Sequence, residues 1–244
     1  MIRNLMLVAL IAAAPSFALT GEEILEKMDQ NRNHTTISYK GIMEIHIDDE
    51  VRTKQMSAKA MAGKKEKAIV TFLNPADEGT KYLMIDDKLW IYFPEEEDVV
   101  KISGHMLKEG MMGSDVSYED ALESDKLSDK YDIQRVGEET IDGYDCYVIK
   151  LDAKVKDVPY FKRKMWVTKS NFVQIKEEMY AKSGKLLKTS RTLEIKKIGD
   201  RDFPVKVEMV NKLRKNSKTI FTMRNIEFDK PMNESTFSMR YLRR

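Results

Sequence analysis

The sequence contains a single cysteine, Cys146, so no disulfide can form within the chain. Its stability must therefore come from buried apolar surface. Cys146 lies in the apolar-rich stretch 144–151, where we expect a small buried side chain and not a reactive thiol.

Sequence motifs of catalysis and metal binding are also missing. The chain has no G-x-S-x-G elbow, no phosphate-binding glycine loop, no H-E-x-x-H and no C-x-x-C. Its three histidines, His34, His46 and His105, lack the spacing of metal ligands. The acidic run 95–98 could hold a cation, but a solvated turn is the simpler interpretation. We therefore predict that the protein is not an enzyme and has no catalytic residue, metal or cofactor.

Charge of one sign does not accumulate along the chain. Forty-two lysines and arginines are interleaved with 40 acidic residues, and the net charge is +2. This mixture argues against a nucleic-acid partner. The exception is the basic tail, residues 240–244, which could make transient contact with acidic lipid headgroups or simply be a solvated end.

The chain has no apolar run long enough to span a membrane. Residues 5–14 are apolar, follow Arg3 and precede the small residues Ser16 and Ala18. Spanning hydrocarbon takes about 20 residues, so a cleaved secretory signal at residues 1–18 is favoured over a retained anchor. No cysteine stands directly after this apolar run, which argues against a lipoprotein. We predict a soluble periplasmic protein in which residues 19–244 form one domain.

Most of the mature chain alternates apolar and polar residues, as strands with one buried face do. The alternation is clear at residues 39–47 and recurs up to residues 220–228, with turn signals such as Asp142-Gly143 and Ser183-Gly184 between runs. Thr20 and Glu23 have the spacing of a capping box and predict a short amphipathic helix at residues 21–31. The long helical crossovers that parallel strands require are missing.

These runs predict a mainly β fold of the α+β type. We expect a strongly curved antiparallel sheet, an unclosed half-barrel of about 10 or 11 strands, because so wide a twisted sheet cannot stay flat. Short helices should cover its concave apolar face. The expected core residues are Ile24, Met28, Ile45, Val70, Phe72, Ile91, Cys146, Val148, Trp166, Ile175, Leu193, Val207 and Phe221.

The stretch 89–120 changes character part-way. It begins as two short strands and then becomes rich in glycine and methionine, with Met106, Leu107, Met111 and Met112 between glycines. Ser117 and Asp120 repeat the capping spacing and predict a second short helix. We interpret residues 104–123 as a lid segment over the concave face, hinged at Gly104 and Gly113. A rigid loop packed only for stability is the alternative.

Three short patterns in this stretch carry a family resemblance. They are Trp-x-Tyr-x-Pro at residues 90–94, Lys-Ile-Ser-Gly at 101–104 and Met-Gly-Ser-Asp-Val-Ser-Tyr-Glu-Asp at 112–120. Together they resemble the outer-membrane lipoprotein-sorting protein family, relatives of the periplasmic carrier LolA. Met111 and Val116 stand where this family leads us to expect phenylalanine-like residues. The resemblance extends over the whole exported chain.

The resemblance implies a periplasmic carrier that binds acyl chains of lipoproteins or phospholipids in an apolar cavity and moves them toward the outer membrane. Inner- and outer-membrane transport partners and a monomeric state are expected. The 16 methionines suit either a cavity for flexible chains or ordinary core packing, and the resemblance favours the cavity. The predicted acyl-chain ligands are Trp90, Tyr92, Met106, Leu107, Met111, Met112, Met165, Trp166, Met179, Met209, Phe221 and Met223.

Two other functions remain open from the sequence. A periplasmic sensor of the same fold could detect lipidated proteins and signal to a membrane partner. A hydrolase is the more distant alternative, because no catalytic motif supports it.

Overall fold

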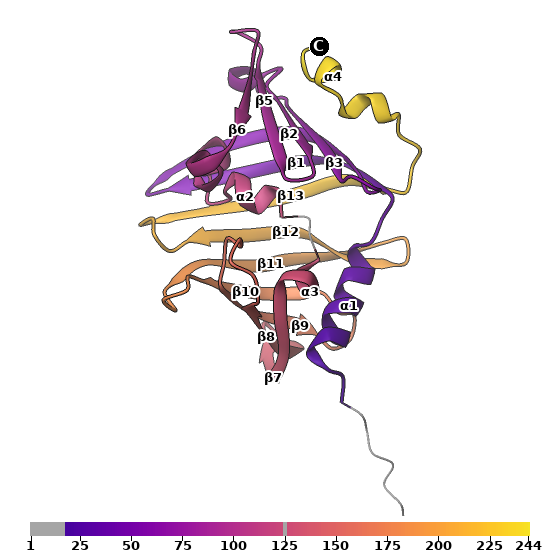
Figure 1. The fold of residues 1–244 in the computed structure, drawn as a ribbon, viewed down its shortest axis with the longest axis vertical. Coiled ribbons are helices and arrows are strands. Elements are labelled where there is room, and N and C mark those ends of the chain that lie inside the picture. The colour runs from indigo at the N-terminus through magenta and orange to yellow at the C-terminus, as the bar shows by residue number, and fades with distance from the viewer. Residues whose placement is uncertain (1–17, 124–125) are drawn as a thin grey trace, which may run out of the picture.

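One antiparallel sheet of 13 strands makes up most of the computed structural model, which describes residues 18–123 and 126–244 (Figure 1). The predicted signal segment therefore lies almost entirely outside the described residues. The strands are β1 (Thr36–Ile47), β2 (Glu50–Met61), β3 (Lys67–Phe72), β4 (Lys81–Ile85), β5 (Lys88–Phe93), β6 (Asp98–Ile102), β7 (Tyr131–Ile141), β8 (Tyr144–Ala153), β9 (Lys162–Thr168), β10 (Gln174–Tyr180), β11 (Leu186–Ile198), β12 (Arg201–Asn211) and β13 (Ser217–Phe228).

The order of the strands shows how the chain builds the sheet. Strands β1 to β6 run outward from the centre to one edge, and β7 to β13 return from the other edge until β13 pairs with β1. The chain therefore has to cross from edge strand β6 to edge strand β7 in a single connection. That connection, residues 103–130, contains the predicted lid segment.

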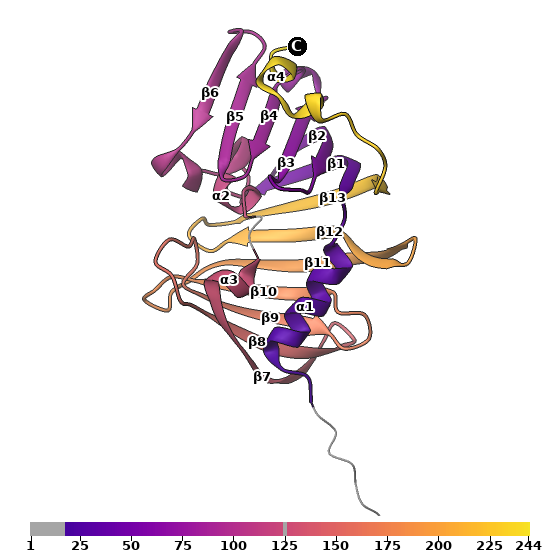
Figure 2. The same cartoon turned by 45° about the vertical axis from the view of Figure 1, so that its right-hand side comes forward.

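The sheet is strongly curved, and the two edge strands do not pair (Figures 1 and 2). The predicted mainly β, antiparallel, unclosed half-barrel is confirmed. The described residues form 13 strands where we expected about 10 or 11.

Helix α1 (Gly21–Arg32) covers one half of the concave face and contacts β7, β8 and β12 (Figure 2). The predicted capping box is confirmed: Thr20 Oγ1 accepts from Glu23 N at 3.2 Å, and Glu23 Oε2 accepts from Thr20 N at 2.8 Å. Ile24, Leu25 and Met28 repeat at helical spacing and face the sheet. With α3 (Leu127–Lys130) lying close to β7, this half has its own apolar cluster. Its buried members are Ile24, Leu25, Met28, Tyr131, Ile133, Ile149, Leu151, Met165 and Val167.

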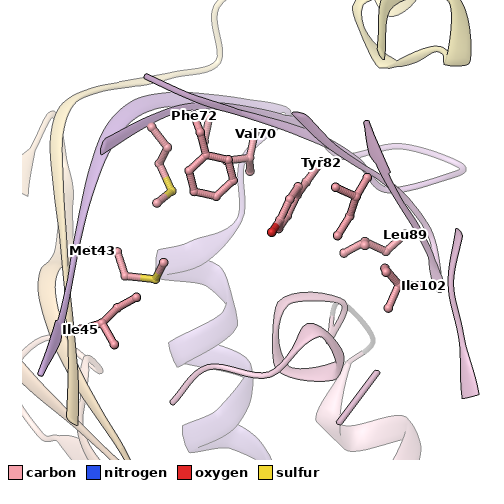
Figure 3. Packing of buried hydrophobic residues seen from close by; sticks show 10 residues of the cluster. Met43, Ile45, Val70, Phe72, Tyr82, Leu89 and Ile102 are labelled. Atoms are coloured by element: carbon pink, nitrogen blue, oxygen red, sulfur yellow. The ribbon is translucent and has the colours of Figure 1, made fainter. Parts of the chain in front are cut away.

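A second apolar cluster fills the other half of the concave face. Figure 3 shows its side chains pointing from the arched sheet toward the short helices beneath it. Every second residue of a strand points to the same face, and these side chains are the ones that point to the concave face. The buried members are Met43, Ile45, Met56, Ala58, Val70, Phe72, Tyr82, Leu89, Ile91 and Ile102.

The convex face is also covered in part, by the C-terminus. The short helices η4 (Glu234–Phe237) and α4 (Met239–Leu242) place Phe237 and Leu242 against Ile69 and Leu83 of the sheet. The tail is therefore not simply a solvated end, because Leu242 is fully buried.

Ten of the 13 expected core residues are buried, and Val207 and Phe221 are half-buried. Leu193 is the error, because its side chain is 42% exposed. The register of β11 against β12 shifts between Thr192 and Glu194, which leaves Leu193 as a bulge residue outside the alternation.

Across residues 18–123 and 126–244, no helix has both the length and the apolar character needed to cross a membrane.

Candidate functional site

The lid segment crosses the concave face as a compact turn. Its backbone folds back on itself: Met111 N donates to Val116 O at 2.8 Å, and Tyr118 N donates to Glu109 O at 3.1 Å. Gly110 permits this closure, since a Cβ there would lie 2.1 Å from the carbonyl oxygen of Ser114. The segment consists of η2 (Gly104–Lys108), η3 (Met111–Gly113) and α2 (Tyr118–Ala121).

The predicted helix start in this segment is confirmed. Ser117 Oγ accepts from Asp120 N at 3.4 Å, and Asp120 Oδ2 accepts from Ser117 N at 2.7 Å. The predicted hinges, Gly104 and Gly113, have φ values of +59° and +77°, which glycine adopts without strain. Their role as hinges remains a prediction.

The inner surface of the lid segment is apolar and only half-buried. Leu107, Met111, Met112, Tyr118 and Leu122 pack against the cluster shown in Figure 3. They occupy the side of the sheet cluster that would otherwise face solvent. Apolar side chains from a ligand could make the same contacts.

Asp115 fastens the lid segment to the sheet through a buried carboxylate. Its Oδ1 accepts from Ser217 Oγ at 2.6 Å and from Asn211 N at 3.2 Å, and its Oδ2 accepts from Thr219 Oγ1 at 2.9 Å. Asp115, Ser217 and Thr219 are all buried. Every donor lies on or at the end of β12 and β13, so this contact joins the lid segment to the centre of the sheet.

Two further acids of the lid segment pair with buried cations. Lys188 of β11 donates to Asp120 and, at 3.0 Å, to Ser117 Oγ. Arg163 of β9 donates to Glu123 and, at 2.9 Å, to Glu177 Oε1. The Arg163 side chain is only 4% exposed. Between the two apolar clusters, the concave face therefore carries a charged belt.

Burial and pairing shift the pKa values of this belt. Burial raises the pKa of Glu177, while the neighbouring Arg163 opposes the rise. Burial alone would lower the pKa of Arg163, but the carboxylates of Glu177 and Glu123 raise it, so the guanidinium stays charged. Burial and Asp120 raise the pKa of Tyr160, which keeps its hydroxyl a donor to Asp120.

The cavity beneath helix α1 on the concave face is small. A cavity of about 60 Å³ lies between α1 and strands β10 to β12, with Met28, Phe172 and Val207 in its wall. Ligand pockets typically measure about 300–1,000 Å³. An acyl chain could therefore enter this cavity only if the side chains around it moved.

A groove of about 310 Å³ lies on the other side of the sheet. Its wall carries Asp142, Arg191 and Glu194 beside Tyr144 and Leu193. This groove is open and charged, so it does not provide an apolar cavity.

The structure brings part of the predicted ligand set together. Leu107, Met111 and Met112 of the lid segment pack on the same cluster as Phe221 of β13. Met209 shares that face, since it pairs with Thr219, and Met223 pairs with Gly41. The remaining residues fall into three other places.

Two methionines lie on the concave face but away from the lid cluster. Met165 packs beneath α1, and Met179 is buried between the lid-bound cations. Met106 is 36% exposed and does not join the apolar contact of its neighbours.

Trp90, Tyr92 and Trp166 lie on the convex face, on the opposite side of the sheet from the lid segment. Trp90 and Tyr92 pack with the C-terminal helices, and Trp166 packs with Cys146 and donates to Glu139 Oε2 at 2.7 Å. The reason is the two-residue period of a strand: their neighbours in sequence face inward, so these three must face outward.

The sequence interpretation missed the charged belt. Asp115 and Asp120 stand inside the quoted family pattern, but Lys188, Arg163 and Glu123 stand in no motif. One signal was present, because Arg163 alternates with Met165 and Val167 and must share their buried face. Among the residues described, no three His, Cys, Asp or Glu side chains are grouped as a metal site would require.

A curved, unclosed sheet with a lid-covered concave face defines a LolA-like half-barrel. The model of a family described as "Uncharacterized protein" matches residues 64–244, and the chain belongs to this family. The resemblance to the outer-membrane lipoprotein-sorting proteins is confirmed.

Solved structures of similar fold include a DUF1329 family protein from Desulfovibrio piger. It is 28% identical, with a TM-score of 0.85 over 91% of this chain and 97% of that one. An outer membrane lipoprotein-sorting protein domain from Vibrio parahaemolyticus is 24% identical, with a TM-score of 0.81 over 92% and 98%. A LolA superfamily protein from Nitrosomonas europaea is also 24% identical, with a TM-score of 0.75 over 92% and 100%. No curated protein matches the chain.

Proposed function

We propose that the protein is a periplasmic carrier that binds acyl chains of lipoproteins or phospholipids on its concave face and shuttles them toward the outer membrane. The observation that carries this proposal is the lid segment, whose half-buried methionines and leucines pack on a continuous apolar cluster of the sheet. The likeness to lipoprotein-sorting and LolA superfamily structures supports it through the fold.

The energy of transfer explains why such a surface is useful. Each methylene buried from water contributes about 0.8 kcal/mol, so a chain of about 16 carbons faces roughly 12 kcal/mol on entering water. A carrier that offers apolar contacts in place of the bilayer removes most of this cost. Exchange of lid contacts for ligand contacts keeps binding reversible without a nucleotide site.

The closed structure fits such an exchange. Leu107, Met111 and Met112 of the lid segment pack directly on the apolar cluster of the sheet, so a chain that binds this cluster would take their place as the lid segment moves aside. Methionine side chains suit this role, because they are flexible and pack against varied apolar partners. The hinges Gly104 and Gly113 would take up the backbone change.

The test is to purify the protein from native envelope, extract it and identify bound lipid by mass spectrometry. The double variant Met111→Asp and Met112→Asp should lose most of the lipid yet keep its fold, because both residues line the apolar inner surface. Met106→Asp is the matched control, since Met106 lies in the same segment but outside that contact. It should retain lipid at the wild-type level.

Three outcomes contradict parts of the proposal. Absence of lipid from the wild-type and variant samples would exclude the carrier. Equal amounts of bound lipid in the wild type and the double variant would be consistent with a carrier but would exclude a lid function for residues 104–123. A stable protein partner in envelope pull-downs, without lipid exchange between vesicles by the pure protein, would favour the sensor.

A further inference from the structure

Two buried cations, Arg163 and Lys188, lie in the same cross-strand row of the concave face, with Met179 between them. Met179 of β10 pairs with Arg163 of β9 on one side and with Lys188 of β11 on the other. The three residues therefore share one face and one cross-strand row. Neighbouring strands are about 4.8 Å apart, so the two cationic residues start about 10 Å from each other and can converge on one group.

Most of the negative charge that balances this pair comes from the lid segment. Arg163 and Lys188 hydrogen-bond to three carboxylates, and two of these, Glu123 and Asp120, belong to the lid segment. The third, Glu177, belongs to the sheet. Lys188 also has its other hydrogen-bond partner, Ser117, in the lid segment.

Opening the lid would therefore leave an imbalance of charge. Arg163 would keep Glu177, but Lys188 would lose both Asp120 and Ser117. An acyl chain can replace the apolar contacts of the lid, but it cannot replace a carboxylate. A buried charge without a partner is strongly unfavourable, so a purely apolar ligand would open this lid poorly.

We propose that Arg163 and Lys188 form a binding site for the anionic headgroup of the acylated ligand, and that the lid carboxylates Asp120 and Glu123 occupy this site when no ligand is bound. The inference rests on the proposed carrier function and names its ligand class: an acyl chain attached to a phosphate or similar anion.

The surroundings of the two cations fit this ligand. Guanidinium groups bind phosphate through paired hydrogen bonds, and an ammonium group adds a point charge. The hydroxyl of Tyr160, which donates to Asp120 in this structure, could donate to a ligand oxygen once Asp120 has left the site. The Tyr131 hydroxyl accepts from Arg163 Nε and donates to the carbonyl oxygen of Tyr160, so it holds the guanidinium in place. Apolar surface for the chain adjoins the site, because Met179 lies between the cations and Met165 lies beside Arg163 on β9.

The experiment compares two ligands with the same acyl chain, lysophosphatidylglycerol and monoacylglycerol, below their critical micelle concentrations. Wild-type protein should bind the phosphorylated ligand about tenfold more tightly, since a charge-assisted pair is worth about one order of magnitude in affinity. Lys188→Met should abolish most of this preference, because the phosphorylated ligand loses its cation, whereas binding of monoacylglycerol should not weaken, because lid opening no longer leaves a buried ammonium group unpaired.

Asp120→Asn supplies the decisive second variant. It removes the charge that competes with the ligand, so it should strengthen binding of lysophosphatidylglycerol, whereas Lys188→Met weakens it. Opposite effects from the two halves of one ion pair would not arise from a purely structural role. Lys196→Met, which removes an exposed cation from the same strand, should leave the preference unchanged.

Urea unfolding of each variant confirms that it is folded, and Asp120→Asn carries the test by itself if Lys188→Met does not fold. Equal weakening by both variants, or equal affinity of wild type for the two ligands, would overturn the headgroup site while leaving the carrier intact. Binding of neither ligand would overturn the carrier as well. If inorganic phosphate alone fully displaced lysophosphatidylglycerol, the site would be one for free anions, and the proposal of an acylated ligand would be overturned.

Discussion

The two covers of the concave face are built in different ways. Helix α1 is regular, has a complete capping box and places Ile24, Leu25 and Met28 in full burial. The lid segment is a chain of short helical pieces whose apolar residues are half-buried and whose contact with the sheet depends on Asp115, Asp120 and Glu123.

This difference separates a permanent cover from a replaceable one. The apolar face of α1 has no substitute when it leaves the sheet, so its removal exposes core residues to water. The lid segment offers contacts that a ligand could reproduce: flexible apolar side chains and a few negative charges. Local stability differs within one fold for reasons of this kind.

The largest expected effect lies in α1. Ile24→Ala removes a fully buried side chain and should lower the free energy of unfolding by about 3 kcal/mol. Urea unfolding followed by circular dichroism measures it. The control is Leu213→Ala, whose side chain is 57% exposed and whose loss should cost little. Similar losses for the two variants would contradict the view of α1 as a permanent cover.

The next effect concerns the lid segment. Asp115→Ala leaves the hydroxyls of Ser217 and Thr219 without their acceptor and should ease lid opening by about 2 kcal/mol. Hydrogen exchange at the amides of Met111 and Tyr118, both bonded within the lid turn, reports this opening.

The exposed acid Asp157 gives the control for this variant, because Asp157→Ala should leave the exchange unchanged. The comparison between covers predicts that α1 keeps its protection in Asp115→Ala. Faster exchange throughout α1 would show that the two covers are one cooperative unit.

A smaller destabilisation should follow when a side-chain atom is added at Gly110, inside the lid turn. Gly110→Ala places a Cβ against the backbone oxygen of Ser114, so the turn must open at a cost of about 1.5 kcal/mol. Limited proteolysis should then cut the lid segment faster. Gly137→Ala on β7 meets nothing within 4 Å and serves as the matched control. An unchanged rate for Gly110→Ala would mean that the turn is not needed for closure.

The smallest effect depends on pH. Burial and the neighbouring Asp120 raise the pKa of Glu119 in the lid, although Lys188 and Lys108 oppose the rise. A carboxyl whose pKa is raised by folding stabilises the fold at low pH and loses that contribution as pH rises through the folded pKa.

Glu119→Gln should therefore stabilise the protein slightly at pH 7, by about 0.5 kcal/mol, with the advantage disappearing below the usual pKa range of a glutamate. Urea midpoints at pH 7 and near pH 4 give the comparison. A variant less stable than wild type at both values would contradict this sign.

How much of this protein could be predicted from its sequence differs between its parts. Alternation of apolar residues was enough for the curved antiparallel sheet, and the spacings Thr20 to Glu23 and Ser117 to Asp120 were enough for both helix starts. These signals involve residues that are close in sequence, so they can be recognised without knowledge of distant contacts.

The tertiary structure decided which face each strand presents and what the lid segment meets there. Trp90, Tyr92 and Trp166 each stand one position away from a residue that faces inward, so they lie on the convex face. Their large aromatic side chains alone made them look like part of an apolar lining. The ion pairs of Asp120 with Lys188 and of Glu123 with Arg163 join residues 68 and 40 positions apart. No local pattern encodes such pairs, because they exist only where the crossover between the two sheet edges brings the lid acids over the strands that return to the centre.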